Sequence, residues 1–378
     1  MARRMKMTVR SEDITDGETI YVALDLGRKR WTVGYLLPGD RTARLQHLSG
    51  DLRCELGKLL SRLRKQFGGG RIVSCFEAGR DGFWLDRWLA RCGVENRVLD
   101  PSSLEVPRRL RRAKTDKLDT VGLLRVLLRL ERGETDLTRV VRVPDPWVED
   151  MRRLTRERER LVKERTSHIG RIKSLLATQG VMGVRVGARG WVDRLEGART
   201  GDGRVVGPKL VAELRREAAR LELLKEQIKE VEAERRAALE EDTSLARDAR
   251  ALMRFNGIAE GFSSGLMFEA FWRDFDNGRQ VGGSFGLVPL PFESGEMRKQ
   301  QPIGKSGNRR ARTLAIECAW MWVRHQPRSA LTLWWRERFA KGGPRQRKIG
   351  IVALARKLMI ALWNYLRHGV VPEGAIIR

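Results

Sequence analysis

The sequence predicts an α/β region followed by a longer helical region. Between residues 20 and 130, short apolar runs alternate with amphipathic helical patterns and with glycine stops. From residue 149 onward, leucines recur at spacings of three, four and seven, and the segment after residue 319 carries tryptophan and leucine at helical spacing. We therefore expect a mixed-sheet domain (1–145), a helical coiled-coil stalk (146–245) and a mainly helical C-terminal domain (246–378).

Composition points to a polyanionic partner. The 378 residues include 75 Lys and Arg against 48 Asp and Glu, a net charge of +27, and 41% are hydrophobic. The four cysteines form no CxxC pair and there are four histidines, which argues against a zinc site or a disulfide scaffold and favours a reducing cytoplasm. We expect no apolar run long enough to span a bilayer and no signal peptide.

The first domain reads as an ordered series of strands and helices. We expect strands at 20–26, 31–37, 41–48, 71–76 and 97–99, and helices at 52–67, 83–92 and from 115 onward. The first three strands form a meander, and helices separate the later ones. This order matches the ribonuclease-H-like (RuvC-like) layout, a mixed sheet with helices on its faces.

Four acids stand where that layout holds its catalytic carboxylates: Asp25 in the first strand, Glu77 after the fourth, and Asp116 and Asp119 in the late helix. A carboxylate in a buried strand is costly unless it is paired or binds a cation. Positions i and i+3 share one helix face. Oxygen ligands suit Mg²⁺ or Mn²⁺, and two such ions can serve an in-line displacement at phosphorus. Taken singly, the same acids are typical of a turn, a surface and an acidic first helical turn.

Basic residues precede the acidic helix and recur near the C-terminus. We predict nucleic-acid contacts at Arg108, Arg109, Arg111, Arg112, Lys114, Lys305, Asn308, Arg309 and Arg312. Residues 251–270 read as a helix, a turn at Gly257 and a second helix, which is typical of a helix-hairpin-helix that binds phosphate or of an ordinary helical hairpin. A further basic cluster between Lys341 and Lys357 is a candidate nucleic-acid surface.

The middle of the chain carries two apolar seams in densely charged helices. The first runs from Met151 to Leu176 and the second from Leu210 to Val231. A helical spacer with solvated charges is the favoured interpretation. The alternative is a dimerising coiled coil whose basic residues contact phosphate.

Three segments, 22–26, 76–79 and 114–119 (KTDKLD), resemble the DEDD transposases of insertion-sequence family 110, whose relatives include the Piv-type DNA invertases. Residues 285–295 and 304–312 look like the second block of the same transposases. The resemblance implies that Asp25, Glu77, Asp116 and Asp119 are catalytic metal ligands and that Ser294 is a nucleophile. It also implies a coiled coil between two catalytic parts.

The resemblance further implies a site-specific recombinase guided by a structured bridge RNA that the element encodes. Its expected partners are donor and target DNA, that RNA, and copies of itself in a homodimer or homotetramer, with no membrane. We expect a bacterial cytoplasmic protein that associates with the nucleoid when bound to DNA. Two alternatives stay open: a Holliday-junction endonuclease that uses metal-activated water, and a non-enzymatic nucleic-acid packaging protein.

Overall fold

The computed structural model describes residues 18–104, 116–134, 138–294, 297–304 and 306–378, without the side chains of Asp116 and residues 290–301. The chain divides into two compact units, Met1–Val143 and Pro144–Arg378. The first boundary lies two residues before the predicted one. The stalk and the C-terminal domain share the second unit, so their division at residue 245 stays a prediction.

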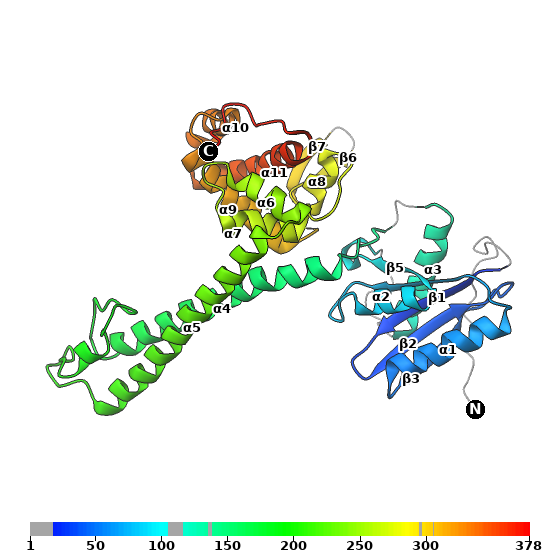
Figure 1. Ribbon diagram of the computed structural model, residues 1–378, viewed down its shortest axis with the longest axis horizontal. Coiled ribbons are helices and arrows are strands. Elements are labelled where there is room, and N and C mark those ends of the chain that lie inside the picture. Colours follow the sequence, from blue (N-terminus) through cyan, green and yellow to red (C-terminus); the bar gives the residue numbers. More distant parts are fainter. Residues whose placement is uncertain (1–17, 105–115, 135–137, 295–296, 305) are drawn as a thin grey trace. The chain divides into compact units, whose positions relative to one another are not determined.

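The first unit is built on a mixed five-stranded sheet (Figure 1). Its strands are β1 (Ile20–Leu26), β2 (Arg30–Leu36), β3 (Arg44–Ser49), β4 (Ile72–Glu77) and β5 (Glu95–Leu99), in the order β3-β2-β1-β4-β5. The first three strands pair antiparallel, as a meander requires, whereas β1–β4 and β4–β5 pair parallel across helical crossovers. This sheet confirms the predicted α/β class and is compatible with a ribonuclease-H-like domain.

Helices cover both faces of the sheet. Alternate residues of β1 point to opposite faces, so Ile20, Val22 and Leu24 share a core with α1 (Leu52–Gln66) and α2 (Trp84–Arg91). Tyr21 and Ala23 pack on the other face against α3 (Asp116–Glu131). A short 3-10 turn, η2 (Pro101–Ser103), follows β5.

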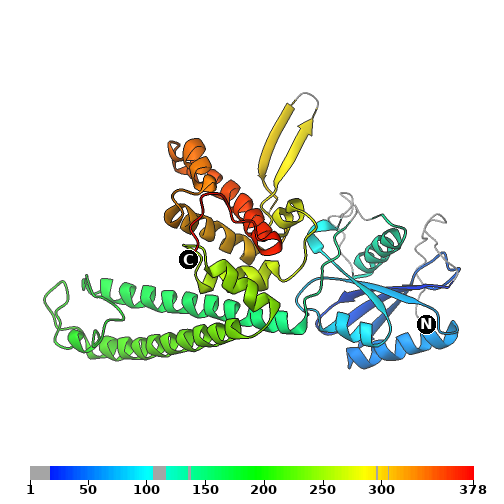
Figure 2. The same ribbon diagram turned by 45° about the horizontal axis from the view of Figure 1, so that its top comes forward.

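The second unit begins with a long helical hairpin. Its arms are α4 (Pro146–Ala177) and α5 (Pro208–Glu240), which lie side by side in Figures 1 and 2, and its connection contains η4 (Asp193–Leu195). Arg158 pairs with Glu232 at 2.5 Å and Arg171 with Glu213 at 2.8 Å, so the two arms run antiparallel. Leu161, Ile172 and Leu176 on one arm and Leu214, Leu221 and Ile228 on the other form the buried seam.

The remaining helices enclose one apolar core. They are α6 (Ser244–Met253), α7 (Glu260–Leu266), η5 (Met267–Phe271), α8 (Gly278–Ser284), α9 (Arg309–His325), α10 (Ala330–Trp335), η6 (Arg336–Ala340) and α11 (Pro344–His368). A two-stranded hairpin, β6 (Pro289–Ser294) and β7 (Met297–Ile303), extends from these helices in Figure 2. The mainly helical class predicted for this part is confirmed.

The turn between α6 and α7 is covered by the protein itself. Gly257 has a φ of +93°, and a Cβ there would lie 3.0 Å from Cβ of His325 in α9. The Asn256 amide donates to the carbonyl of Ile376 at 3.3 Å, and its own carbonyl accepts from Gln326 at 3.0 Å. The Asn256 amide, a donor that a phosphate-binding turn could present, is thus already used within the protein, and the phosphate-binding helix-hairpin-helix stays a prediction.

Helix α11 corrects one expectation. By length and composition alone its 25 residues would suffice to cross a membrane, and it is the one helix to meet that test in the described part of the chain. It buries Ile351, Leu354, Leu358 and Leu362 in the core of the second unit, and its middle carries Arg356 and Lys357. The expectation that no apolar segment has this length was therefore wrong, and the segment is a helix of the protein core.

Candidate active site

Two of the predicted acids lie side by side at the C-terminal ends of neighbouring inner strands of the sheet. Asp25 and Glu77 follow directly after Leu24 and Phe76, which are register partners in the parallel strands β1 and β4. Neighbouring strands lie about 4.8 Å apart, and partnered residues of a parallel pair point to the same face. Because Ala23 and Cys75 pack against α3, the acids two residues later continue that same face. Asp25 is half-buried and Glu77 is exposed.

The register of α3 brings Asp119 to the same level. Arg71, just before β4, pairs with Glu131 at the end of α3 at 3.1 Å, and the Cys75 thiol donates to the carbonyl of Leu123 at 3.5 Å. Four strand residues span about 13 Å and eight helix residues about 12 Å, so the helix runs antiparallel to the strand. Continuing by two residues to Glu77 adds about 6.6 Å, or roughly four helix residues, which reaches Asp119.

A glycine sets how closely α3 approaches the sheet. Gly34 of β2 pairs with Ala23, and a Cβ built on Gly34 would lie 2.8 Å from the Cγ2 methyl of Thr120. Thr120 is fully buried and follows Asp119 directly. Only a residue without a side chain at position 34 leaves room for this contact, which therefore positions the acidic end of α3.

The described side chains include three of the four predicted metal ligands, Asp25, Glu77 and Asp119, but not that of Asp116. Asp116 is the first residue of α3, one helical turn before Thr120, and Asp119 is exposed. Among the side chains that the structure describes, no three or more His, Cys, Asp or Glu gather closely enough to hold a metal ion. The Asp116 side chain lies outside that set. The donor chemistry, carboxylate oxygens only, fits Mg²⁺ or Mn²⁺.

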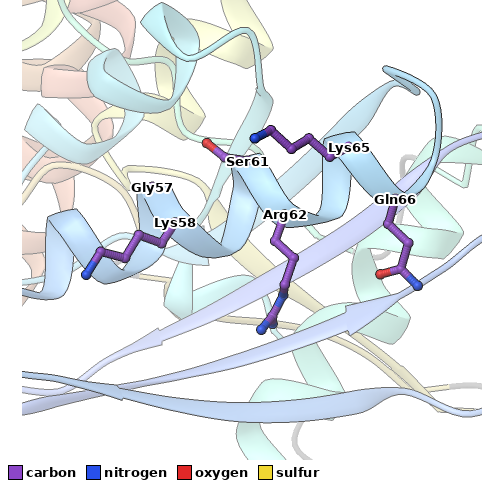
Figure 3. Close-up of a pocket in the computed structure, with 6 residues that line it drawn as sticks. All are labelled: Gly57, Lys58, Ser61, Arg62, Lys65 and Gln66. Atoms are coloured by element: carbon purple, nitrogen blue, oxygen red, sulfur yellow. The ribbon is translucent and has the colours of Figure 1, made fainter.

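A basic hollow lies away from these acids. It has a volume of about 770 Å³ on the outer face of α1 and is lined by Gly57, Lys58, Ser61, Arg62, Lys65 and Gln66 (Figure 3). Arg62 points from α1 toward β3, where it donates to the Gln46 side chain at 2.8 Å. Since α1 covers the face opposite α3, this hollow is not part of the acidic site.

Ser294 occupies the end of a β-hairpin in the second unit. It is the last residue of β6 and is the register partner of Met297, the first residue of β7. The connecting residues 295 and 296, the predicted Lys305, and the basic residues 108–114 lie outside the described residues. The site roles predicted for them, and for the Ser294 hydroxyl, stay predictions.

Close backbone contacts clamp the base of this hairpin. The Asn308 amide donates to the carbonyl of Ser284 at 3.0 Å, and the Gly304 amide donates to that of Val288 at 3.0 Å. Gly286 has a φ of +63°, and a Cβ there would lie 1.9 Å from the carbonyl oxygen of Ser306. The segments that enter and leave the hairpin are therefore held together by a contact that excludes side chains.

Asn308 is engaged inside the protein. Its carboxamide oxygen accepts from the amides of Arg310 and Ala311 and so caps α9, while its Nδ2 donates to Oε2 of Glu269 at 2.8 Å. These bonds assign Asn308 to positioning α9 and the hairpin base. A contact with nucleic acid at Asn308 remains a prediction.

Glu269 is a residue that the sequence interpretation missed. Its side chain is buried in η5, and Arg156 of α4 donates to it from Nε at 2.7 Å and from Nη2 at 3.0 Å. Burial alone would raise the pKa of Glu269, but hydrogen bonds from Arg156 and Asn308 outweigh burial and lower it. A lone acid in the apolar run 266–272 was the available signal, the same signal that singled out Asp25.

The other predicted phosphate ligands differ in their surroundings. Arg309 is exposed, whereas Arg312 is half-buried. Burial and the neighbouring Arg309 charge lower the pKa of Arg312, which donates to the carbonyl of Phe285 at 3.5 Å. Arg310, between them, pairs with Glu159 of α4 at 3.0 Å. Arg309 is thus the more accessible of the two predicted ligands.

Comparison with known proteins covers both units. A family model described as "Transposase" matches residues 22–179, and one described as "Transposase IS116/IS110/IS902 family" matches residues 249–333. Two Sinorhizobium fredii proteins, named "Putative transposase y4rJ" and "y4qE", are 43% and 32% identical to the chain. These alignments cover 95% of the chain and 94% of the first relative, and 68% of the chain and 60% of the second. The "Transposase for insertion sequence element IS1111A" of Coxiella burnetii is 28% identical over 58% of each chain.

Proposed function

Because the chain belongs to the IS116/IS110/IS902 family of transposases, we propose that it cuts and rejoins DNA through Ser294 and a carboxylate cluster. Family membership supports the enzyme class, phosphodiester strand transfer on DNA. The cluster's location is supported by one observation: Asp25 and Glu77 stand side by side near the ends of neighbouring parallel strands, at the level that the register of α3 assigns to Asp119.

In this proposal the Ser294 oxygen attacks a DNA phosphorus and one deoxyribose oxygen leaves. The resulting phosphoserine diester keeps the phosphorus in an ester linkage, so that a DNA hydroxyl can later displace the serine and rejoin the strand. Asp25, Glu77, Asp116 and Asp119 would hold Mg²⁺ or Mn²⁺. Such ions would neutralise phosphate charge when bound. The end of a hairpin clamped at its base is suited to presenting a hydroxyl to a strand. The acids belong to the first unit and Ser294 to the second, and either one subunit or two subunits can supply them to the reaction.

The proposal further includes a bridge RNA that selects donor and target DNA, and assembly into a homodimer or homotetramer through the α4–α5 hairpin as a coiled coil. An RNA that pairs with DNA would relieve the protein of reading the whole site. The strongly basic composition supports binding to nucleic acids mainly through their phosphate groups. The protein would act in the bacterial cytoplasm.

The nucleophile is tested by trapping a covalent adduct. Wild-type protein, element-end DNA and the element's RNA should yield a denaturation-resistant protein–DNA adduct that Ser294→Ala abolishes. A matched Ser61→Ala change on the outer face of α1 should leave the adduct intact. An adduct that survives Ser294→Ala overturns the serine assignment. Metal-dependent cleavage that never yields an adduct favours the junction endonuclease.

The acids are tested in the same assay. Asp119→Asn and Glu77→Gln should each lower the adduct yield at least about 100-fold while DNA affinity holds, because a misplaced or missing ligand raises the barrier to transfer. Glu55→Gln on α1 is the charge-matched control. Chelation should abolish the adduct, and Mg²⁺ or Mn²⁺ should restore it. Nucleic-acid binding that is unchanged after all four acids are neutralised, with no adduct from the wild-type protein and no metal dependence, would favour the packaging alternative.

A further inference from the structure

Charge is distributed very unevenly over the second unit. Residues 330–366 contain eight Lys and Arg but a single acid, Glu337. Seven of those cations are exposed, on η6, the turn after it, and α11. Arg336 donates to the carbonyl of Pro327, and we call the other six the cationic patch: Arg338, Lys341, Arg345, Arg347, Lys348 and Lys357. Figure 1 shows α11, which carries four of the patch residues, and α10, which precedes the patch in the chain, in red and orange.

The patch lacks the internal compensation found elsewhere. In the α4–α5 hairpin, arginines pair with glutamates of the same or the facing helix, as Arg158 does with Glu232 and Arg171 with Glu213. Within the described residues, none of the six patch cations forms a salt bridge with a carboxylate. Arg338 and Lys357 instead lie over the ring of Trp334, at 5.7 and 4.8 Å from its centroid. Cations gathered without acids repel one another, and a polyanion removes that cost.

The start of α11 stands clear of the core. Residues 343–349 are all exposed, Ile349 by 55%, and the first buried residue of the helix is Gly350. A Cβ on Gly350 would lie 2.4 Å from the ring of Phe339, so η6 and α11 pack in close contact around the turn at 341–343. The exposed turns are therefore an extension of a helix that is firmly anchored in the core.

We propose that the cationic patch docks double-stranded DNA, with the exposed first turns of α11 entering the major groove. A helix with its side chains is about 10–12 Å across, which matches the B-DNA major groove of about 12 Å. The deep, narrow major groove of an RNA duplex excludes it. Arg345, Gln346 and Arg347 carry side-chain types that bond to guanine and adenine edges. This inference rests on the proposed action on DNA and adds a duplex contact made by the protein itself.

Equilibrium binding to the full-length protein tests the surface. The variant Arg345→Ala/Arg347→Ala/Lys348→Ala is titrated by fluorescence anisotropy against a DNA duplex of about two helical turns. Loss of three cations from the DNA contact should weaken binding on the order of 100-fold near 0.1 M salt and lower the salt slope by about 3, whether each cation faces a base edge or a phosphate. The control Lys209→Ala/Arg216→Ala/Lys229→Ala removes the same charge from exposed positions of α5 and should weaken binding less than about threefold. Equal losses in the two variants would overturn the proposal.

An RNA duplex of the same sequence separates the two nucleic acids. Its affinity should fall much less than that of DNA in the α11 variant, and an equal or larger fall would reassign the patch to RNA. The measurement requires no strand transfer, so it is independent of the Ser294 adduct. Unchanged DNA affinity in a variant that still forms the adduct refutes the docking surface and leaves the recombinase proposal standing.

Discussion

Arg156 and Glu269 form a two-bond ion pair, 2.7 Å from Nε and 3.0 Å from Nη2, that joins the hairpin helix α4 to the C-terminal core. The carboxylate also accepts from Asn308, the residue that caps α9 and closes the base of the β6–β7 hairpin. One buried acid therefore links three parts of the second unit that are far apart in sequence.

Removing this acid should destabilise the second unit. Glu269→Gln leaves Arg156 and Asn308 with unmatched donors, and losing one partner of a buried pair costs about 3–5 kcal/mol. Since the Arg156 side chain is 41% exposed and partly screened by solvent, we expect a smaller cost, about 2–3 kcal/mol, in denaturant unfolding. Glu157→Gln, in the exposed pair with Arg160, should cost less than about 0.5 kcal/mol. Similar costs for both would contradict the role given to Glu269.

The same pair predicts how stability depends on pH. The folded-state pKa of Glu269 is lowered, so its stabilisation is complete above the ordinary glutamate value of about 4.3 and is lost as pH falls through the folded value. Wild-type stability should therefore drop more steeply below about pH 4.3 than that of Glu269→Gln. Burial raises the pKa of Asp248, an effect of opposite sign that both proteins share and that cancels in the difference. Parallel pH profiles would count against the assignment.

Gly286 should be essential for holding the serine hairpin. Gly286→Ala places a Cβ in the left-handed region and against the Ser306 carbonyl, which should cost about 1–3 kcal/mol and expose the hairpin to proteolysis. Gly283→Ala is the matched control, because its Cβ meets nothing within 4 Å. If a protease cuts Gly286→Ala no faster than the control, the close approach of Gly286 to the Ser306 carbonyl is not required to hold the hairpin.

Gly34 should control the acidic end of α3. Gly34→Ala pushes against the Thr120 methyl and should lower strand transfer at least about tenfold, since ångström-scale misplacement of catalytic groups is costly. Thr120→Ser removes that methyl and should restore much of the activity in the double variant. Gly122→Ala, on the same helix with open space around it, should stabilise α3 by about 1 kcal/mol and leave activity intact. If Thr120→Ser does not restore the strand transfer that Gly34→Ala loses, the loss does not come from the contact between Gly34 and Thr120.

The secondary structure and the candidate acids were largely readable from the sequence. Strand β1 matches its predicted bounds, and the other elements of the first unit differ by one to three residues at their ends, because periodicity and glycine stops are local signals. Asp25 and Glu77 were identified the same way, as acids within or just after apolar strands. The level of Asp119 along the sheet depends on the register of α3, which contacts between residues distant in sequence decide.

What the sequence by itself determined is the family, the order of elements and the positions of the acids and Ser294, since each is encoded in a short segment. Tertiary structure decided which polar groups are already in use. Asn308 donates to Glu269 inside the protein, and arginines of the α4–α5 hairpin pair with glutamates of the facing helix. The cations at the start of α11 form no salt bridge with a carboxylate among the described residues. The reason is physical: a charge is satisfied by whatever the folded chain brings within a few ångströms, and composition carries no record of those distances.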